Sequence, residues 1–259
     1  MANFSLNIAD LEYFLMILVR IASFMFTAPF FSTSGVPRRT KVGFSVVVAF
    51  MLYFTLPSGN LQYSTVIQYG AIVVKEAVVG ISIGYAANIC SSIVLFAGKV
   101  IDMEIGLSMA TMFDPVTREN ASISGAFYNY FVLILMVVTD MHHFILRALV
   151  DTYTLIPING MVIDFDHMFT SVVKFLTDYI VIGFRIALPI FACILILNVV
   201  LGILAKVAPQ MNMFAVGMQL KLLVGFAVMF LTISLLPSVA NFIFEEMKVM
   251  IVSVVEGLY

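Results

Sequence analysis

Long apolar stretches separated by short polar turns dominate the chain. Roughly 20 apolar residues are enough to cross a bilayer as a helix. Apolar stretches of about this length or longer lie at residues 11–31, 40–56, 65–97, 122–139, 141–158, 171–205, 213–236 and 239–258. The stretches at 65–97 and 171–205 are far longer than one crossing. The pattern predicts an all-α fold of membrane-type helical hairpins, with about six long, broken apolar helices and a final stretch that is either a span or an interfacial helix.

The turn between the apolar stretches at 171–205 and 213–236 predicts a helical hairpin with a polar tip. The turn is expected at Pro209, Gln210, Asn212 and Gly217, where the two runs meet, because proline, asparagine and glycine favour turns. An ordinary hairpin turn explains Pro209 and Asn212. Together with Lys221, the polar side chains could also contact a partner at the cytoplasmic face. Helix breaks are expected at three prolines: Pro29, Pro189 and Pro209.

Composition excludes most soluble classes of protein. The 259 residues are 62% hydrophobic and 11% charged, whereas soluble domains are roughly half apolar and about a quarter charged. A net charge of −2 offers no basic field for nucleic acid. These values leave an integral membrane protein and argue against a soluble enzyme, a disordered chain or a nucleic-acid binder. Asp10 and Glu12 precede the first cation, Arg20, so we expect no cleaved signal peptide.

Loop charges predict an orientation in the membrane. Cytoplasmic loops are enriched in lysine and arginine, and Arg38, Arg39 and Lys41 follow the first apolar stretch. The loops at 57–64 and 151–170 lack both residue types and are expected outside. This alternation predicts six crossings and an external N-terminus, in a multi-pass membrane protein.

Charged residues within or beside the apolar stretches indicate contacts with protein rather than lipid. Each costs several kcal/mol if it faces lipid at mid-membrane. We expect these residues to be buried charges or subunit contacts: Arg20, Lys75, Glu76, Asp102, Arg185, Lys206 and Lys221.

The adjacent pair Lys75-Glu76 cannot neutralise itself, because neighbouring side chains on a helix point about 100° apart. Each side chain therefore needs a partner on another helix or subunit. An ion pair between subunits is favoured over a proton or ion relay. No second carboxylate lies nearby at mid-span to form a relay chain, which counts against a proton-driven transporter.

Candidate catalytic and metal chemistry is sparse. His142, His143 and His167 are the only histidines, and none has the H-x-x-x-H spacing of a helical metal site. We expect a polar cluster at head-group level and no cofactor. No nucleophile or phosphate-binding motif occurs, and Asp102 and Asp114 do not form a convincing acid–base pair. The sequence predicts a protein that is not an enzyme.

The segment 97–120 is the most unusual part of the chain. It contains Met103, Met109, Met112 and Phe113 together with two glycines and a proline. Methionine is flexible and adapts to variable neighbours. Such a loop could line or close a passage, or it could be an ordinary connector with methionine as core filler, and the residues alone do not separate these alternatives.

Taken together, the motifs resemble the FliR/SctT family of type III export-gate proteins over nearly the whole chain. The resemblance is carried by Arg20 with Pro29 and Pro37-Arg38; Lys75-Glu76 with Gly80 and Gly84; Ala97-Gly98, Ile101-Asp102, Gly106, Ala110 and Asp114-Pro115; Pro157, Pro189, Gly202 and Lys206; and Pro209-Gln210, Asn212, Phe214, Gly217, Lys221 and Gly225. One departure is Asp140-Met141-His142, where the family often has Gly-His.

The resemblance implies a subunit of a helical, pore-like core built with FliP and FliQ homologues in the flagellar basal body. FlhA and FlhB are further implied partners. By analogy, residues 1–165 form a FliP-like part, and residues 166–259 form a FliQ-like hairpin with the C-terminal helix. The family's plug loop corresponds to residues 105–122, with Gly106, Met109, Met112, Phe113, Asp114 and Pro115.

The function implied is passage of unfolded flagellar proteins across the inner membrane, with the Met/Phe loop helping to close the pore. Hydrophobic constrictions can gate by dewetting, while methionine side chains yield to a passing polypeptide. Alternatives are a virulence type III secretion subunit, a pure scaffold, and a small-solute secondary transporter. A transporter usually carries an inverted internal repeat, and no convincing repeat is visible between the halves.

Overall fold

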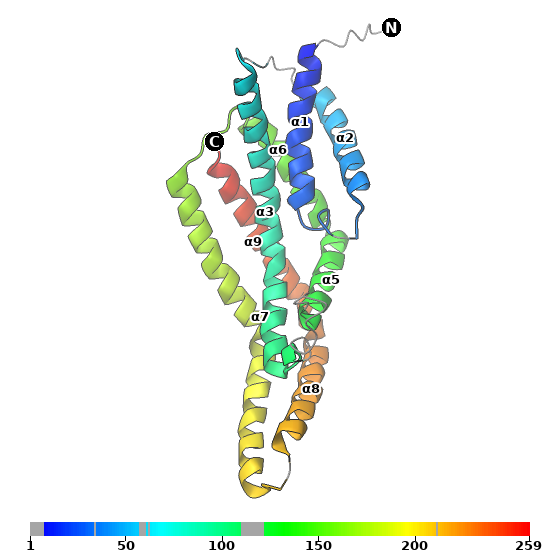
Figure 1. Cartoon of the computed structure of the whole chain (residues 1–259), viewed down its shortest axis with the longest axis vertical. Helices are drawn as coiled ribbons and strands as arrows, with labels where there is room; N and C mark the ends of the chain where they lie inside the picture. The colour runs from blue at the N-terminus through cyan, green and yellow to red at the C-terminus, as the bar shows by residue number, and fades with distance from the viewer. Residues whose placement is uncertain (1–7, 34, 57–60, 62, 110–121, 211) are drawn as a thin grey trace. The chain divides into compact units, whose positions relative to one another are not determined.

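The computed structural model describes residues 8–33, 35–56, 61, 63–109, 122–210 and 212–259, with the side chain of Met213 excepted. Within these ranges every regular element is helical, which confirms the all-α class (Figure 1). The elements are α1 (Ile8–Thr27), α2 (Arg38–Thr55), α3 (Val66–Ile105), α5 (Ile123–Val138), α6 (Met141–Leu155), α7 (Phe165–Val207), α8 (Met213–Thr232), the 3-10 turn η1 (Ile233–Leu235) and α9 (Leu236–Glu256).

Two helices are far longer than a bilayer requires. Helix α3 has 40 residues and α7 has 43, which correspond to about 60 Å and about 65 Å at the α-helical rise. The hydrocarbon core is about 30 Å thick. The prediction of overlong helices is therefore confirmed. The predicted break at Pro189 is wrong, since this proline lies inside α7 and the helix continues on both sides. A proline removes only one hydrogen bond, and long apolar flanks keep the remaining ladder.

The last two apolar stretches form a nearly continuous helical segment. Pro237, between these two stretches, lies in the first turn of α9, where proline is tolerated. Among the described residues, three stretches are long and apolar enough to cross a membrane, namely Val66–Ile105, Phe165–Val207 and Phe214–Glu256. A fourth is added if the bent pair α5 and α6 counts as one span.

By length and composition, the described helices offer three or four spans, against the six crossings predicted from sequence. Helices α1 and α2 are not among these candidate spans, because they carry too many charged residues for their length. Helix α1 has three in 20 residues, and α2 has three in 18 residues. These charges are Asp10, Glu12 and Arg20 in α1, and Arg38, Arg39 and Lys41 in α2.

The chain folds into two compact units assembled from separated stretches. Unit 1 comprises Met1–Cys90, Asp140–Lys174 and Glu246–Tyr259, and unit 2 comprises Ser91–Thr139 and Phe175–Glu245. Helices α3, α7 and α9 contribute to both. Neither unit follows the division at 165/166 that the family resemblance implies, since each takes residues from both sides of it. That division stays a prediction by similarity.

Unit 1 is built on the apolar face of α1. Met16, Ile17, Ile21 and Phe24 are completely buried, at the three- and four-residue spacing of a single helix face. Helix α2 lies beside α1 (Figure 1), where the ring of Tyr53 contacts those of Tyr13 and Phe14. Further buried side chains come from three other helices: Val79 and Ile83 of α3, Ile145 and Leu149 of α6, and Met247 and Ile251 of α9.

Candidate functional site

A buried ion pair lies inside unit 1. Nε of Arg20 on α1 donates to Oε2 of Glu76 on α3 at 2.6 Å, and neither side chain has any exposed surface. Removing two charges from water is costly, and only close geometry with further hydrogen bonds offsets it. The surroundings of the pair supply such bonds.

Arg20 also binds the C-terminal end of α6. Its Nη1 donates to the carbonyl oxygens of Ile156 at 3.0 Å and Thr152 at 3.4 Å, at the end of α6 where the helix dipole favours a cation. The Thr152 carbonyl also accepts from the backbone N–H of Ile156 at 2.7 Å, so Arg20 is its second donor. The guanidinium lies 4.3 Å from the ring centroid of Tyr153. The backbone N–H of Asn159 donates to the second oxygen of Glu76 at 3.0 Å. One charge pair thus joins α1, α3 and the end of α6.

Glu76 and Lys75 point in different directions, as their spacing predicts. Glu76 is buried, whereas Lys75 is half-buried and has no ion-pair partner among the described residues. For Glu76, the sequence favoured a partner on another subunit, and this is corrected: its partner is Arg20 of the same chain.

Two glycines let α3 approach α1 closely beside this pair. A Cβ atom on Gly80 would collide with Oγ of Ser23 and the carbonyl oxygen of Arg20. One on Gly84 would collide with Oγ1 of Thr27. These two glycines, four residues apart on one face of α3, therefore permit backbone contact between the two helices.

In unit 2, buried Asp102 of α3 holds the first turn of α5. The backbone N–H of Ser124 lies 3.3 Å and 3.4 Å from the two carboxylate oxygens of Asp102. Oγ of Ser122 caps the same turn by accepting from the N–H of Gly125 at 2.8 Å. A carboxylate at a helix N-terminus is stabilised by the unpaired N–H groups and the helix dipole.

The predicted plug loop begins at a glycine that ends α3. Gly106 has φ +92°, a conformation that other residues rarely adopt, and its N–H donates to the carbonyl of Asp102 at 3.1 Å. Met109 is 41% exposed. Met112, Phe113, Asp114 and Pro115 lie outside the described residues.

The remaining predicted charges are not buried within the chain. Arg185 and Lys206 are exposed and Lys221 is half-buried. None of these three forms an ion pair within the part of the chain that is described.

The predicted hairpin turn is shorter than expected. Pro209 and Gln210 are exposed between α7 and α8, and the side chain of Asn212 caps α8 by accepting from the N–H of Ala215 at 3.4 Å. Gly217 was expected in the turn, but it lies within α8, where an added Cβ would be 3.3 Å from Cδ1 of Leu201. Its role is therefore to allow packing of α8 against α7.

An apolar pocket of about 390 Å³ lies in unit 2. It is lined by Ile123, Ser124, Phe127, Phe226, Met229, Phe230 and Ile233. The only polar side chain of this lining is Ser124, whose hydroxyl faces Sδ of Met229 at 3.6 Å. Such a lining suits an apolar group and offers nothing to orient a polar solute.

Sequence reasoning missed Thr152, Tyr153 and Asn159 as partners of the buried pair. Their residue types are common at helix ends and in turns, so no local signal marks them.

A second contact in unit 1 joins Tyr63 and Glu12. The hydroxyl of Tyr63 donates to a carboxylate oxygen of Glu12 at 2.6 Å. This hydrogen bond, with a smaller contribution from burial, raises the pKa of Tyr63 above its usual value.

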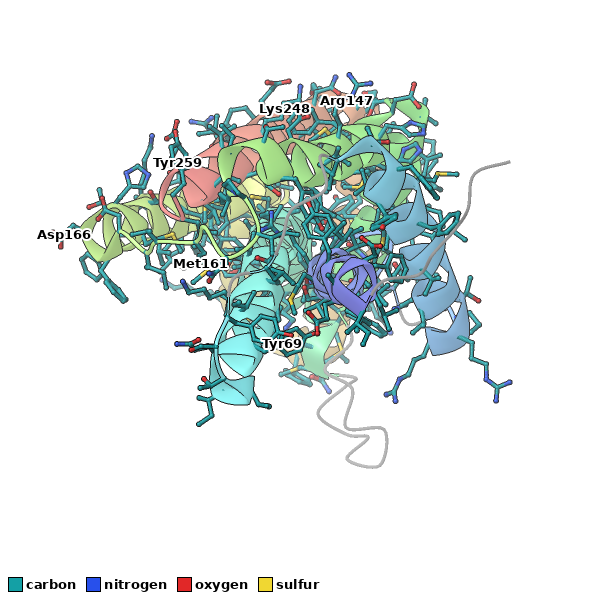
Figure 2. The ribbon with its side chains drawn as sticks, turned by 90° about the horizontal axis from the view of Figure 1, so that it is seen from above. Tyr69, Arg147, Met161, Asp166, Lys248 and Tyr259 are labelled. Carbon is teal, nitrogen blue, oxygen red and sulfur yellow. The ribbon has the colours of Figure 1, made fainter. Side chains whose placement is uncertain are left out.

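The exposed side of unit 1 also carries charge on α6 and α9. Lys248 lies 5.5 Å from the ring centroid of Phe144, and Figure 2 shows Lys248 and Arg147 along the same edge of the structure.

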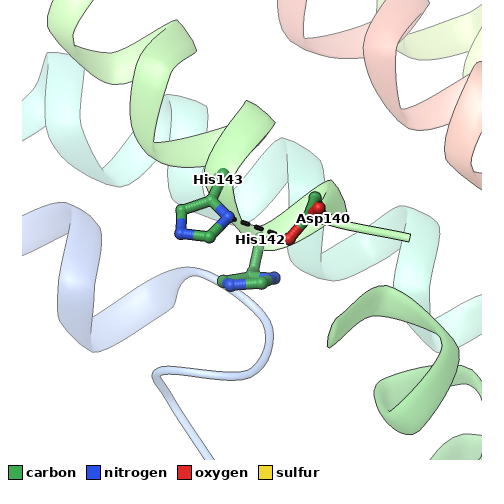
Figure 3. Close-up of side chains that lie close together, drawn as sticks. All are labelled: Asp140, His142 and His143. Carbon is green, nitrogen blue, oxygen red and sulfur yellow. Dashed lines mark hydrogen bonds and ion pairs between the residues drawn. The ribbon is translucent and has the colours of Figure 1, made fainter. Parts of the chain in front are cut away.

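The start of α6 carries the one group of potential metal ligands found among the described residues. It consists of Asp140, His142 and His143 (Figure 3). Asp140 has φ +57°, a left-handed conformation in which glycine is favoured.

Comparison with known proteins gives a match over most of the chain. The profile of a family described as bacterial export proteins, family 1, matches residues 11–247. A relative from Escherichia coli (strain K12), flagellar biosynthetic protein FliR, is 28% identical over 243 residues, which cover 93% of this chain and 92% of the relative. Proteins of the same name from Bacillus subtilis (strain 168) and Buchnera aphidicola subsp. Baizongia pistaciae (strain Bp) are 29% and 30% identical, over 90% and 89% of both chains.

Proposed function

Because the chain belongs to the bacterial export proteins, family 1, we propose that it is a non-enzymatic subunit of the flagellar type III protein export gate. The match over residues 11–247 carries the proposal, since it includes most of the described helices. The resemblance to the FliR/SctT family is confirmed by this match and by relatives named flagellar biosynthetic protein FliR. That name favours flagellar over virulence cargo.

The exposed apolar surface supports a place in a larger membrane assembly. We compare the fraction of the most apolar segment of each candidate span that is buried inside the chain. This fraction is 56% in α3, but only 22% in α7 and 11% in Phe214–Glu256. Apolar surface of this extent needs lipid or another protein to cover it. We assign its covering to inner-membrane lipid and to FliP and FliQ homologues in the basal body, with FlhA and FlhB as further partners.

Arg185 supports contact with another subunit. This exposed cation of α7 lies between Val181 and Leu188, which are 51% and 60% exposed. A cation in such a setting is costly if it faces lipid and is stabilised by a carboxylate from a neighbouring chain. Replacing Arg185 with alanine is expected to reduce recovery of FliP and FliQ with the tagged chain, whereas replacing the exposed Arg147 of α6 should not. Equal recovery with both variants would remove this contact from the proposal.

The loop that begins at Gly106 is proposed to close the pore at rest. Met109 is exposed at its start, and Met112 and Phe113 follow in the sequence. Apolar side chains in a constriction exclude ions by dewetting, and methionine adapts to an unfolded polypeptide.

Replacing residues 106–115 with a Gly-Ser segment of equal length tests this role. We expect the inner membrane to leak small ions, measured with a potential-sensitive dye, while FliP and FliQ still co-purify. A matched pair of single variants is Met109→Ser and Met103→Ser, because Met103 is also exposed but lies on α3 outside the loop. Unchanged ion permeability in the replaced strain, with the complex intact, would contradict the closing role.

Two alternatives make different predictions. A small-solute transporter should be stable and monodisperse when purified alone and should bind a solute, whereas a gate subunit should be lost or aggregate without its partners. A pure scaffold would not contact cargo. Crosslinking a stalled, unfolded flagellar substrate from Met112 or Phe113 would therefore separate a pore lining from a scaffold.

A further inference from the structure

Three metal-ligand atoms gather at the start of α6. Asp140, His142 and His143 each offer one, and these atoms all lie within 4.8 Å of one another. Figure 3 shows the carboxylate of Asp140 directed at the imidazole of His143, with the ring of His142 beside them. We propose that these three residues form a binding site for a borderline divalent transition-metal ion such as Zn²⁺, a property separate from the proposed export function.

The backbone holds the carboxylate away from its ordinary position. Asp140 occupies the N-cap of α6, where an aspartate normally accepts a hydrogen bond from an N–H of the first turn. Here its side chain makes no capping hydrogen bond, and its residue lies in the left-handed region with φ 57° and ψ 18°. Oδ1 is instead 3.1 Å from Nδ1 of His143. The turn therefore presents the carboxylate to an imidazole.

The two imidazoles lie close to each other. Their ring centroids are 4.0 Å apart, and the ring of His142 also packs against Phe30, with centroids 5.9 Å apart. This contact places His142 beside the more exposed pair, since the side chains of His143 and Asp140 are 65% and 76% exposed. An ion held here would keep water in its remaining coordination positions.

The donor set selects the class of ion. Two imidazole nitrogens and one carboxylate oxygen suit Zn²⁺ and its neighbours among the transition metals, whereas Mg²⁺ and Ca²⁺ prefer oxygen ligands. Ligand atoms around tetrahedral Zn²⁺ lie about 3.3 Å apart. The donor atoms already lie within 4.8 Å of one another. The exposed side chains of His143 and Asp140 have room to rotate toward the closer spacing.

Zinc titration of the gate complex containing the full chain tests the site. Zn²⁺ alone is the probe, and isothermal titration calorimetry is the readout. We expect His142→Ala and His143→Ala each to weaken binding at least about tenfold. The matched control is His167→Ala, since His167 is the third histidine and its Nε2 faces the carbonyl oxygen of Ser253 at 3.2 Å. Equal affinity in all three variants, or no Zn²⁺ bound by the unaltered complex, would overturn the proposal.

A second measurement identifies the ligands directly. Electron paramagnetic resonance of Cu²⁺ bound to the complex should show nitrogen couplings that are lost in the His142→Ala/His143→Ala double variant and kept in His167→Ala. Asp140→Asn retains a residue that tolerates the left-handed conformation and is expected to weaken Zn²⁺ binding. The control is Asp151→Asn, which changes an exposed residue of the same helix and should leave Zn²⁺ binding unchanged. Nitrogen couplings that persist in the double variant would place the ion elsewhere.

Discussion

Nε of Arg20 and Oε2 of Glu76 lie 2.6 Å apart with both side chains fully buried. The two residues are 56 positions apart in the chain, on α1 and α3. Because the arginine also donates to carbonyl oxygens at the end of α6, this pair determines how three helices of unit 1 are held together.

Replacing Glu76 with alanine should destabilise unit 1 by about 3–5 kcal/mol, because Arg20 would be left as a buried, uncompensated charge. Thermal unfolding of the purified complex, followed by circular dichroism, measures the loss. Lys75→Ala is the matched control, since Lys75 is adjacent, half-buried and without an ion-pair partner among the described residues. The double variant Arg20→Met/Glu76→Leu should recover part of the stability. A similar loss for Lys75→Ala and Glu76→Ala would contradict the role given to the pair.

Alanine at Gly80 should force α3 away from α1, because its Cβ would collide with Ser23 and the Arg20 carbonyl. We expect a loss of about 1–3 kcal/mol from overpacking, measured by the same unfolding experiment. Gly70→Ala is the matched substitution on the same helix, where an added Cβ meets nothing within 4 Å. Alanine there should be neutral or stabilise by up to about 1 kcal/mol. A neutral Gly80→Ala would show that the two helices can separate at little cost.

Removing the Asp102 side chain should open the first turn of α5. Asp102→Ala leaves the buried N–H of Ser124 without its acceptor, at a cost of about 1–3 kcal/mol, while Asp102→Asn keeps an oxygen and should cost less. Hydrogen exchange of Ser124 and its neighbours reports the opening. Glu104→Ala is the control, because Glu104 has no hydrogen-bond or ion-pair partner among the described residues. Protection of Ser124 that is unchanged in Asp102→Ala would refute the contact.

Substitutions at Gly106 should act through backbone strain alone. Its φ is +92° and an added Cβ meets nothing within 4 Å, so alanine is expected to cost about 1–2 kcal/mol and asparagine less. Gly202→Ala in α7 is the comparison, since it also has open space but no positive φ. Faster hydrogen exchange at the end of α3 in Gly106→Ala is the expected result, and equal exchange in both alanine variants would contradict it.

The contact between Tyr63 and Glu12 should be pH-dependent. The hydrogen bond to the Glu12 carboxylate raises the pKa of Tyr63, so the folded state keeps this proton more tightly than the unfolded chain. Its stabilising contribution is complete below the ordinary tyrosine pKa of about 10 and is lost as the pH rises through the folded value. Ultraviolet titration against Tyr63→Phe isolates this residue. A Tyr63 pKa at or below the ordinary value would be inconsistent with the bond.

Much of the helical architecture could be predicted from local sequence. Apolar stretches far longer than 20 residues require internally bonded backbone in a membrane, so α3 and α7 were expected as long helices. Gly80 and Gly84 were visible in the sequence as part of the family resemblance, but their close packing against α1 emerged only from the structure. The prolines were harder to interpret: the same residue ends a helix, begins one, or lies within one as Pro189 does, according to what flanks it.

The candidate site depended more strongly on tertiary structure. An all-α membrane protein, with charges too costly to leave in lipid, could be inferred from the sequence alone, because hydrophobic length, composition and charge placement are local properties of the chain. Only the fold decided that Glu76 meets Arg20 while Lys75 does not, and that Asp140 turns toward His143 instead of capping α6. Such pairings are set by helix rotation and backbone conformation across distant segments, and no spacing along the chain encodes them.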